Sequence, residues 1–167
     1  METDSTRRLF MWNKLKPYVI SIAIALAVGG LAAFLTRDNM DIYGRINTPP
    51  LSPPAALFPV VWTILYILMG ISAAIVYVNR DENLQAAEDG LKIYAVQLLA
   101  NFGWSIIFFN FEAYWLAFIW LVLLWGLILK MIAKFREVNE VAAYLQIPYL
   151  IWVTFAGYLN FMIALLN

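Results

Sequence analysis

Five long apolar runs alternate with short polar segments along the chain. The runs cover residues 17–35, 55–78, 91–110, 114–133 and 144–166. A helix needs roughly 20 predominantly apolar residues to cross the ~30 Å hydrocarbon core of a bilayer, and each run is long enough. No segment between the runs could hold a soluble domain. The pattern predicts an all-α fold, with residues 1–167 forming a single domain of five transmembrane helices.

The composition agrees with a membrane protein and narrows the chemistry. Hydrophobic residues make up 63% of the chain and charged residues 13%, with a mean hydropathy of +0.75; soluble domains are usually ~45–50% apolar. The sequence has no Cys and no His, which excludes thiolate and imidazole metal ligands, Cys or His catalysis and a His ligand to haem. We expect no metal site. The net charge is zero, so we expect no nucleic-acid partner.

The basic residues predict the orientation in the membrane. Nine of the eleven Lys and Arg residues lie in the N-terminal tail, the second loop and the fourth loop, whereas only Arg37 and Arg45 lie in the first loop. Because basic loops stay in the cytoplasm, we expect the N-terminus inside and the C-terminus outside. A signal peptide cleaved after Ala27 is the alternative for the first run. The apolar run continues to Leu35, which favours a retained helix.

Prolines crowd the start of the second apolar run, in NTPPLSPPAALFPVVWTILY (residues 47–66). Ser52 followed by Pro53 predicts the helix start, with Ser52 as N-cap and Pro53 at the first helical position. The two upstream prolines should hold the loop in a semi-rigid, extended form. Pro59 would then lie about two turns inside and kink the helix, which opens space near the membrane surface. Alternatively, the prolines only end one helix and start the next.

Polar side chains occur deep inside two of the predicted helices. Gln97, Asn101 and Trp104 share one face of the third helix, and Asn101 lies ~15 Å from its start, near the bilayer midplane. Buried amides are costly without partners, so both amides should point into the bundle. They either join helices through hydrogen bonds or donate to a ligand in a cavity. In the fifth helix, Trp152 and Ala156 share a face that could oppose them.

The seven tryptophans fall into three groups. Trp12 and Trp115 fit the aromatic belts at membrane interfaces, and we assign Trp120 and Trp125 to packing or lipid contacts. The remaining three come from three different helices: Trp62, Trp104 and Trp152. If they converge, they would form a flat-walled pocket for a large planar ligand. Phe58, Trp62 and Tyr66 share one face of the second helix.

Three segments resemble one known family. They are IYGRINTPPLSPPAALFPVVWTILYILMG (residues 42–70), QLLANFGWSIIFFN (97–110) and PYLIWVTFAGYLNFMIALLN (148–167). Together they resemble the translocator protein / tryptophan-rich sensory protein family (TspO/MBR), also called the peripheral benzodiazepine receptor family. The resemblance covers essentially all five predicted spans.

The resemblance implies a homodimeric five-helix bundle. Members bind porphyrins such as protoporphyrin IX, sterols, and isoquinoline or benzodiazepine drugs in a pocket beneath the first loop, which acts as a lid. With Tyr66 added from the helix face that it shares with Trp62, the predicted ligand-binding residues are Tyr43, Pro53, Trp62, Tyr66, Asn101, Trp104, Trp152 and Ala156. The only enzymatic activity implied is light-dependent porphyrin degradation, with Trp62 and Trp152 as its catalytic residues. No tightly bound cofactor is implied, and porphyrin would be a ligand or substrate.

The chain departs from the family at two first-loop positions. Thr48 and Leu51 stand where lysine and tryptophan are usual, so a cationic partner for a porphyrin propionate is missing unless Arg45 or Arg37 replaces it. No basic residue follows Tyr158, so a C-terminal sterol motif is absent. The predicted location is a bacterial plasma membrane.

Three functions remain open. The first is a porphyrin-binding receptor or sensor. The second is a tetrapyrrole or lipid transporter, although no inverted repeat or intramembrane carboxylate supports ion-coupled transport. The third is an interaction protein whose dimer face contains Ala95, Leu99 and Gly103, since small residues let helices approach closely.

Overall fold

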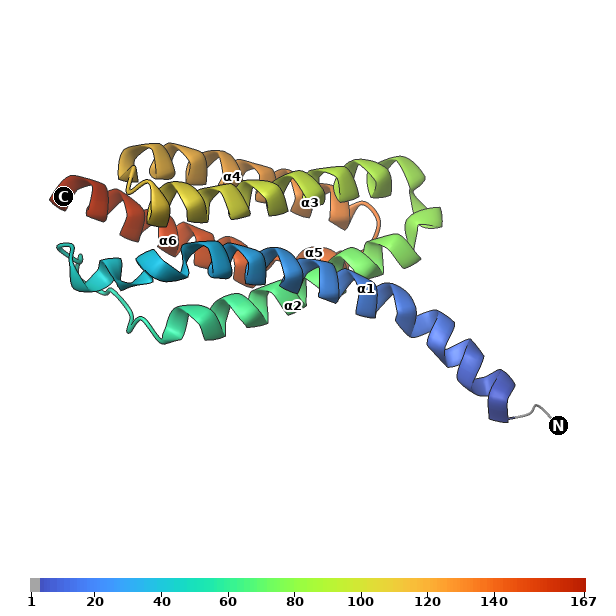
Figure 1. Cartoon of the computed structure of the whole chain (residues 1–167). Coiled ribbons are helices and arrows are strands. Elements are labelled where there is room, and N and C mark those ends of the chain that lie inside the picture. Colours follow the sequence, from blue (N-terminus) through green and yellow to red (C-terminus); the bar gives the residue numbers. More distant parts are fainter. Residues whose placement is uncertain (1–3) are drawn as a thin grey trace.

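The protein is a bundle of long helices (Figure 1). The computed structural model describes the backbone from Asp4 to Asn167. It describes the side chains from Trp12 onward, except that of Tyr43. The elements are α1 (Asp4–Thr36), the 3₁₀ helix η1 (Arg37–Gly44), α2 (Leu57–Val78), the 3₁₀ turn η2 (Arg80–Glu82), α3 (Leu84–Ser105), the π-helical turn η3 (Ile106–Asn110), α4 (Tyr114–Arg136), α5 (Glu140–Tyr144) and α6 (Ile147–Leu166). Five helical segments are long and apolar enough to cross a membrane. The predicted all-α class and its five spans are confirmed.

Three helical spans begin earlier than their apolar runs, and two of these start at asparagine N-caps. α3 begins at Leu84, where Asn83 is the N-cap and its side chain accepts a 3.1 Å hydrogen bond from the Ala86 amide. In the last span, Asn139 caps α5 by accepting hydrogen bonds from the amides of Val141 and Ala142. Asparagine is among the best N-cap residues because its side chain satisfies free amides of the first turn. The early part of α3 contains Glu88 and Asp89, and the first turn of α5 contains Glu140, so a search for apolar runs overlooks both helix starts.

The prediction that Ser52 and Pro53 start the second helix is wrong. α2 begins at Leu57, and the Ser52 hydroxyl instead donates a 2.8 Å hydrogen bond to the Pro49 carbonyl. This bond closes a turn in which Leu51 has a φ of 69°. Pro53 is itself followed by a proline, and a proline disfavours the α conformation in the residue before it. The helix therefore starts only after the proline pair.

The later start also changes the role of Pro59, which is the third residue of α2. The first four amides of a helix have no partner within the helix, so a proline there removes no hydrogen bond. The predicted proline kink two turns inside the helix is therefore wrong. Pro59 lies in the first turn, where its fixed φ suits a helix beginning.

Close helix contacts hold the two sides of the bundle together. α1 packs along α2, and α4 packs against α3 and α6. At Gly70 of α2, an added Cβ would lie 2.5 Å from the Ile22 Cα of α1, so the two backbones nearly touch. Such approach between membrane helices requires a small residue.

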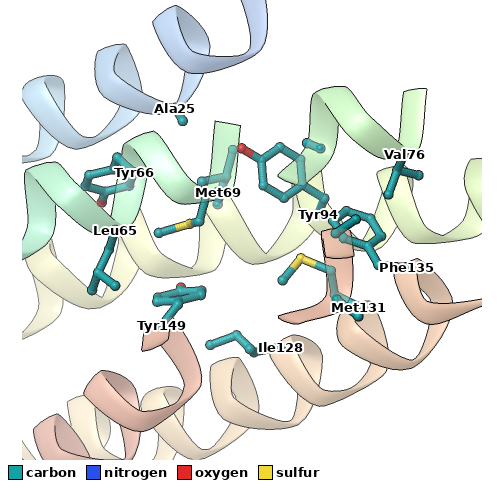
Figure 2. Packing of buried hydrophobic residues seen from close by; sticks show 14 of the residues in the cluster. Ala25, Leu65, Tyr66, Met69, Val76, Tyr94, Ile128, Met131, Phe135 and Tyr149 are labelled. Carbon is teal, nitrogen blue, oxygen red and sulfur yellow. The ribbon is translucent and has the colours of Figure 1, made fainter. Parts of the chain in front are cut away.

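The centre of the bundle is filled from four helices. Figure 2 shows Met69 of α2, Tyr94 of α3, Met131 and Phe135 of α4 and Tyr149 of α6 packed in one cluster. This core lies between the two ends of the molecule. The first loop and the C-terminus share one end, and the start of α1 extends beyond the other (Figure 1).

Candidate functional site

A cavity of about 190 Å³ lies at the end of the bundle where α1 ends, α2 begins and α3 ends. Trp62 of α2, Trp104 of α3 and Trp152 of α6 all line it. The predicted convergence of three indoles is therefore observed. α1 contributes mainly small residues to the wall, including Gly29 and Ala32.

Six of the eight predicted site residues come together at this cavity. They are Trp62, Tyr66, Asn101, Trp104, Trp152 and Ala156. Pro53 does not line it and lies half-buried in the loop before α2. Tyr43 belongs to η1 by its backbone, and its side chain lies outside the described residues. The cavity also includes Met40 and Phe108, which sequence reasoning did not single out because nothing in a local pattern distinguishes them from packing residues.

A chain of hydrogen bonds closes the inner side of the cavity. The Tyr66 hydroxyl donates to Asn101 Oδ1 at 3.1 Å, and Asn101 Nδ2 donates to the Tyr149 hydroxyl at 2.8 Å. Tyr149 in turn donates to Gln97 Oε1 at 2.8 Å. Both predicted buried amides thus have partners, and the bonds join α2, α3 and α6. Asn101 combines this structural role with a place in the cavity wall.

Tyr149 is the member of this network that the sequence analysis missed. Its side chain is only 1% exposed, and it packs edge-on against Trp62 with ring centroids 6.2 Å apart. The predicted ligand-facing side of this helix contains Trp152 and Ala156. Tyr149 lies three residues before Trp152, on a neighbouring part of the helix surface. A polar aromatic residue in an otherwise apolar span was the available signal.

The indole N–H groups of Trp104 and Trp152 differ in their partners. Trp104 Nε1 donates to Asn160 Oδ1 at 3.1 Å, and Asn160 Nδ2 donates to the Tyr114 carbonyl at 2.9 Å, so Trp104 is held in place. Trp152 Nε1 is buried and has no hydrogen-bond partner among the described residues. Its ring contacts Phe58 at a centroid distance of 5.9 Å. An unpaired buried donor is unfavourable until an acceptor reaches it.

Tyr66 can take its position only because Gly29 has no side chain. A Cβ added at Gly29 would overlap the Tyr66 ring. The ring therefore lies directly against the α1 backbone, and its hydroxyl reaches Asn101. This glycine is needed for close approach, since Tyr66 fills the space that a methyl group would take.

Several hydrogen bonds fasten the first loop to the rest of the bundle. On one side, Asn39 Nδ2 of η1 donates to Asn110 Oδ1 at 2.9 Å. On the other side, the backbone N–H of Asn47 donates to Asn167 Oδ1 at 2.9 Å. Asn167 Nδ2 in turn donates to the backbone carbonyl of Asn47 at 3.2 Å. The Tyr158 hydroxyl also donates to a loop carbonyl, that of Pro50, at 3.1 Å. All of these bonds are polar, and the Asn47 and Tyr158 bonds are solvent-exposed.

Arg37 and Arg45, predicted as substitute cations for the missing lysine, do not line the cavity. Arg45 pairs with Asp41 and Glu112, each at 3.4 Å, and Arg37 pairs with Asp38 at 3.5 Å. None of the lining residues carries a charge. In the described part of the chain, no group of three or more Asp and Glu residues could hold a metal ion. The cavity suits stacking, apolar contact and a few neutral hydrogen bonds.

Comparison with known proteins identifies relatives over nearly the whole chain. A family model described as the TspO/MBR family matches residues 21–166. The tryptophan-rich protein TspO of Chlorobaculum tepidum is 38% identical over 149 residues, which cover 89% of this chain and 94% of that protein. Protein CrtK of Rhodobacter capsulatus is 42% identical over 125 residues, or 75% and 78% of the two chains. The translocator protein of Bos taurus is 31% identical over 149 residues, or 87% and 88%.

Proposed function

This chain belongs to the TspO/MBR family, and from that premise we propose that it is a membrane receptor or sensor that binds protoporphyrin IX or a related flat hydrophobic ligand. The observation that carries the proposal is the placement of Trp62, Trp104 and Trp152 around one uncharged cavity. Isoquinoline and benzodiazepine drugs share the flat, apolar character that such walls favour. Each aromatic pair contributes ~0.5–1.5 kcal/mol beyond the burial of its area.

The cavity is too small for a tetrapyrrole unless part of its wall moves. About 190 Å³ is less than the ~300–1,000 Å³ typical of ligand pockets. A tetrapyrrole therefore fits only if the wall moves outward. The first loop is the part most able to do so, because it is fastened by exposed polar bonds at Asn47 and Tyr158, whereas the indoles are set on long helices. We propose that this loop, with Tyr43 and Pro53, is a lid.

The first test is a titration of the purified protein with protoporphyrin IX in the dark, followed by quenching of tryptophan fluorescence. Trp62→Phe and Ala156→Leu should weaken binding, the first by removing a stacking surface and the second by filling the cavity. Trp125→Phe is the matched control, because Trp125 lies on α4, donates to Thr154 at 2.9 Å and does not line the cavity. Equal affinity in all three variants would refute the assignment of the cavity.

Light-dependent porphyrin degradation is the enzymatic activity that we propose to test. The macrocycle would be oxidised by dioxygen, and Trp62 and Trp152 would contact it as the catalytic residues. Illumination of the complex should bleach the Soret band more slowly in Trp152→Phe than in Trp125→Phe. If both variants bleach at the wild-type rate, the protein binds porphyrin without using that indole in the reaction.

Transport of a tetrapyrrole or lipid is the alternative, and the closed inner side of the cavity disfavours it. The bonds from Tyr66 through Asn101 and Tyr149 to Gln97 lie between the cavity and the packed core. A transported ligand would have to break them. Proteoliposomes that contain the protein should show no porphyrin flux above that of empty vesicles, and a saturable flux would favour transport.

We also propose the predicted orientation, in a bacterial plasma membrane with the N-terminus in the cytoplasm and the cavity at the outer end. The chain has no native cysteine, so single cysteines report their side directly. A membrane-impermeant thiol reagent should label Asn167→Cys, but not Lys130→Cys, in intact cells. The reverse pattern would invert the topology.

A homodimer remains part of the proposal, with a smaller face than predicted. Leu99 is 67% exposed on α3 and Ala95 is also exposed. Gly103 instead packs within the chain, since its added Cβ would lie 3.1 Å from the Trp120 ring. Crosslinking through Leu99→Cys should capture a dimer. A monomer under the same conditions would count against this face.

A further inference from the structure

A second cavity, of about 440 Å³, lies at the opposite end of the bundle from the first. Its walls are the early part of α1, the end of α2 and the start of α3, and it shares no lining residue with the first cavity. The volume lies within the range of ligand pockets. No residue that lines it belongs to the proposed porphyrin site.

The cavity contains a buried hydroxyl that has no partner. Tyr94 is 7% exposed and lines the cavity, and its Oη makes no hydrogen bond with any described residue. The ring packs against Phe135 at a centroid distance of 6.2 Å, and Figure 2 shows the hydroxyl on the far side of the ring from Phe135. A buried donor without an acceptor is unfavourable. A ligand oxygen that enters the cavity would remove this deficit.

One cation lines the same cavity, and a second lies against one of its lining residues. Lys16 of α1 lines it and takes part in none of the ion pairs between described residues. The Arg80 guanidinium lies 4.6 Å from the ring centroid of Tyr77, which also lines the cavity. A lysine at a membrane boundary keeps its ammonium at the headgroup level while its stem lies along apolar surface. The rim is therefore suited to an anion at that level.

Apart from Ser21 and the tyrosine hydroxyls, the remaining described lining is apolar, and part of it is exposed on the lipid side. Ile24 lines the cavity and is 53% exposed, and Ile20 beside it is 47% exposed. From Lys16 to Ile24 the helix rises ~12 Å. Along this distance the cavity wall changes from cationic to apolar. A phospholipid changes in the same order, from its charged headgroup to its acyl chains. No tryptophan lines this cavity, which makes it unlike the proposed porphyrin site.

We propose that this cavity binds one anionic phospholipid. Its phosphate would contact Lys16 and Arg80, and the Tyr94 hydroxyl would donate to an oxygen of the glycerol ester. One acyl chain would lie along Ile20 and Ile24. The site is independent of the porphyrin cavity, and its occupant comes from the bilayer leaflet at the N-terminal end of the bundle.

The test is native mass spectrometry of the full chain in detergent with added dioleoyl phosphatidylglycerol, dioleoyl phosphatidylcholine or glycerol phosphate. The wild-type protein should retain one phosphatidylglycerol in preference to phosphatidylcholine, and no glycerol phosphate. Equal retention of the two lipids would overturn the anionic preference. Retention of glycerol phosphate at comparable concentration would show a phosphate site that needs no lipid, and would overturn the proposal.

Substitutions in the cavity wall test whether the retained lipid binds in this cavity. Lys16→Gln should weaken phosphatidylglycerol binding about fivefold, the factor that corresponds to the ~1 kcal/mol of one basic residue near an anionic surface. Lys130→Gln is the matched control, since Lys130 is an exposed cation of α4 outside the cavity. Equal loss in the two variants would mean general charge attraction and would overturn the site. Tyr94→Phe should also weaken binding without lowering thermal stability in lipid-free detergent, because the hydroxyl that it removes has no partner.

Discussion

The side-chain amide of Asn101 donates a 2.8 Å hydrogen bond to the hydroxyl of Tyr149, and this bond joins α3 to α6 directly beneath the cavity. Asn101 also accepts from Tyr66 of α2 at 3.1 Å. One residue therefore sets the spacing of three helices that carry the cavity indoles. An experiment on Asn101 must therefore measure ligand affinity and the stability of the helix bundle separately.

Asn101→Ala should lower both thermal stability and porphyrin affinity. It removes one partner from each of two buried tyrosine hydroxyls, and hydrogen bonds between membrane helices contribute ~0.6 kcal/mol each on average. We expect a loss of about 1–2 kcal/mol in unfolding free energy, measured by thermal or denaturant unfolding in detergent. A variant that keeps wild-type stability but loses binding would show that Asn101 acts mainly as a ligand donor.

Gly29→Ala should reduce porphyrin binding, because the new methyl group would overlap the Tyr66 ring and push its hydroxyl away from Asn101. Fluorescence titration measures the loss. Gly30→Ala is the control one residue along, where nothing lies within 4 Å of an added Cβ; its affinity should stay at the wild-type level. Similar affinities for the two variants would mean that the Tyr66 position does not matter for the ligand.

Protoporphyrin IX and its dimethyl ester should bind with similar affinity. None of the lining residues carries a charge, and the nearby Arg45 is already paired with Asp41 and Glu112. Parallel titrations of the two compounds, and of Arg45→Gln, measure the contribution of the propionates. A clear preference for the free acid that disappears in Arg45→Gln would show that Arg45 leaves its partners to replace the missing lysine at Thr48.

Gln146→Met should stabilise the protein. Gln146 is fully buried between α5 and α6, and neither atom of its amide group has a hydrogen-bond partner. Each unmade buried hydrogen bond costs ~1–3 kcal/mol, and an apolar residue of similar size avoids that cost. Gln97→Met is the contrasting variant, since Gln97 accepts from Tyr149 at 2.8 Å and should lose stability. A lower unfolding temperature for Gln146→Met would contradict the prediction.

Tyr158→Phe should speed ligand association. It removes the 3.1 Å hydrogen bond from Tyr158 to the Pro50 carbonyl and so loosens the first loop at an exposed position. Stopped-flow quenching gives the association and dissociation rates, and we expect both to rise with little change in their ratio. Phe161→Leu, on the same helix and without a loop hydrogen bond, is the control. Unchanged rates in Tyr158→Phe would mean that the ligand enters by another route.

Helical periodicity was enough to single out the three indoles and the two buried amides, but it did not reveal Tyr149, which bonds both amides. Trp62, Trp104 and Trp152 lie on inward faces of long, regular helices. Their spacing in the sequence therefore indicates which helix face each of them occupies. The start of α2 was mispredicted because Ser52 bonds to Pro49 instead of capping a helix, and the geometry of a proline-rich turn depends on several neighbouring residues. Contacts such as Asn47 with Asn167 join residues 120 positions apart, and no local pattern encodes them.

The uncharged lining also determines how ligand binding at this site would respond to the membrane potential. A membrane potential acts on charge that moves through its field, at ~2.3 kcal/mol per elementary charge per 100 mV. None of the described groups that line the proposed porphyrin cavity carries a charge that could be displaced, and a neutral ligand brings none. Occupancy by such a ligand would therefore be the same in energised and depolarised membranes, and would follow the ligand concentration alone.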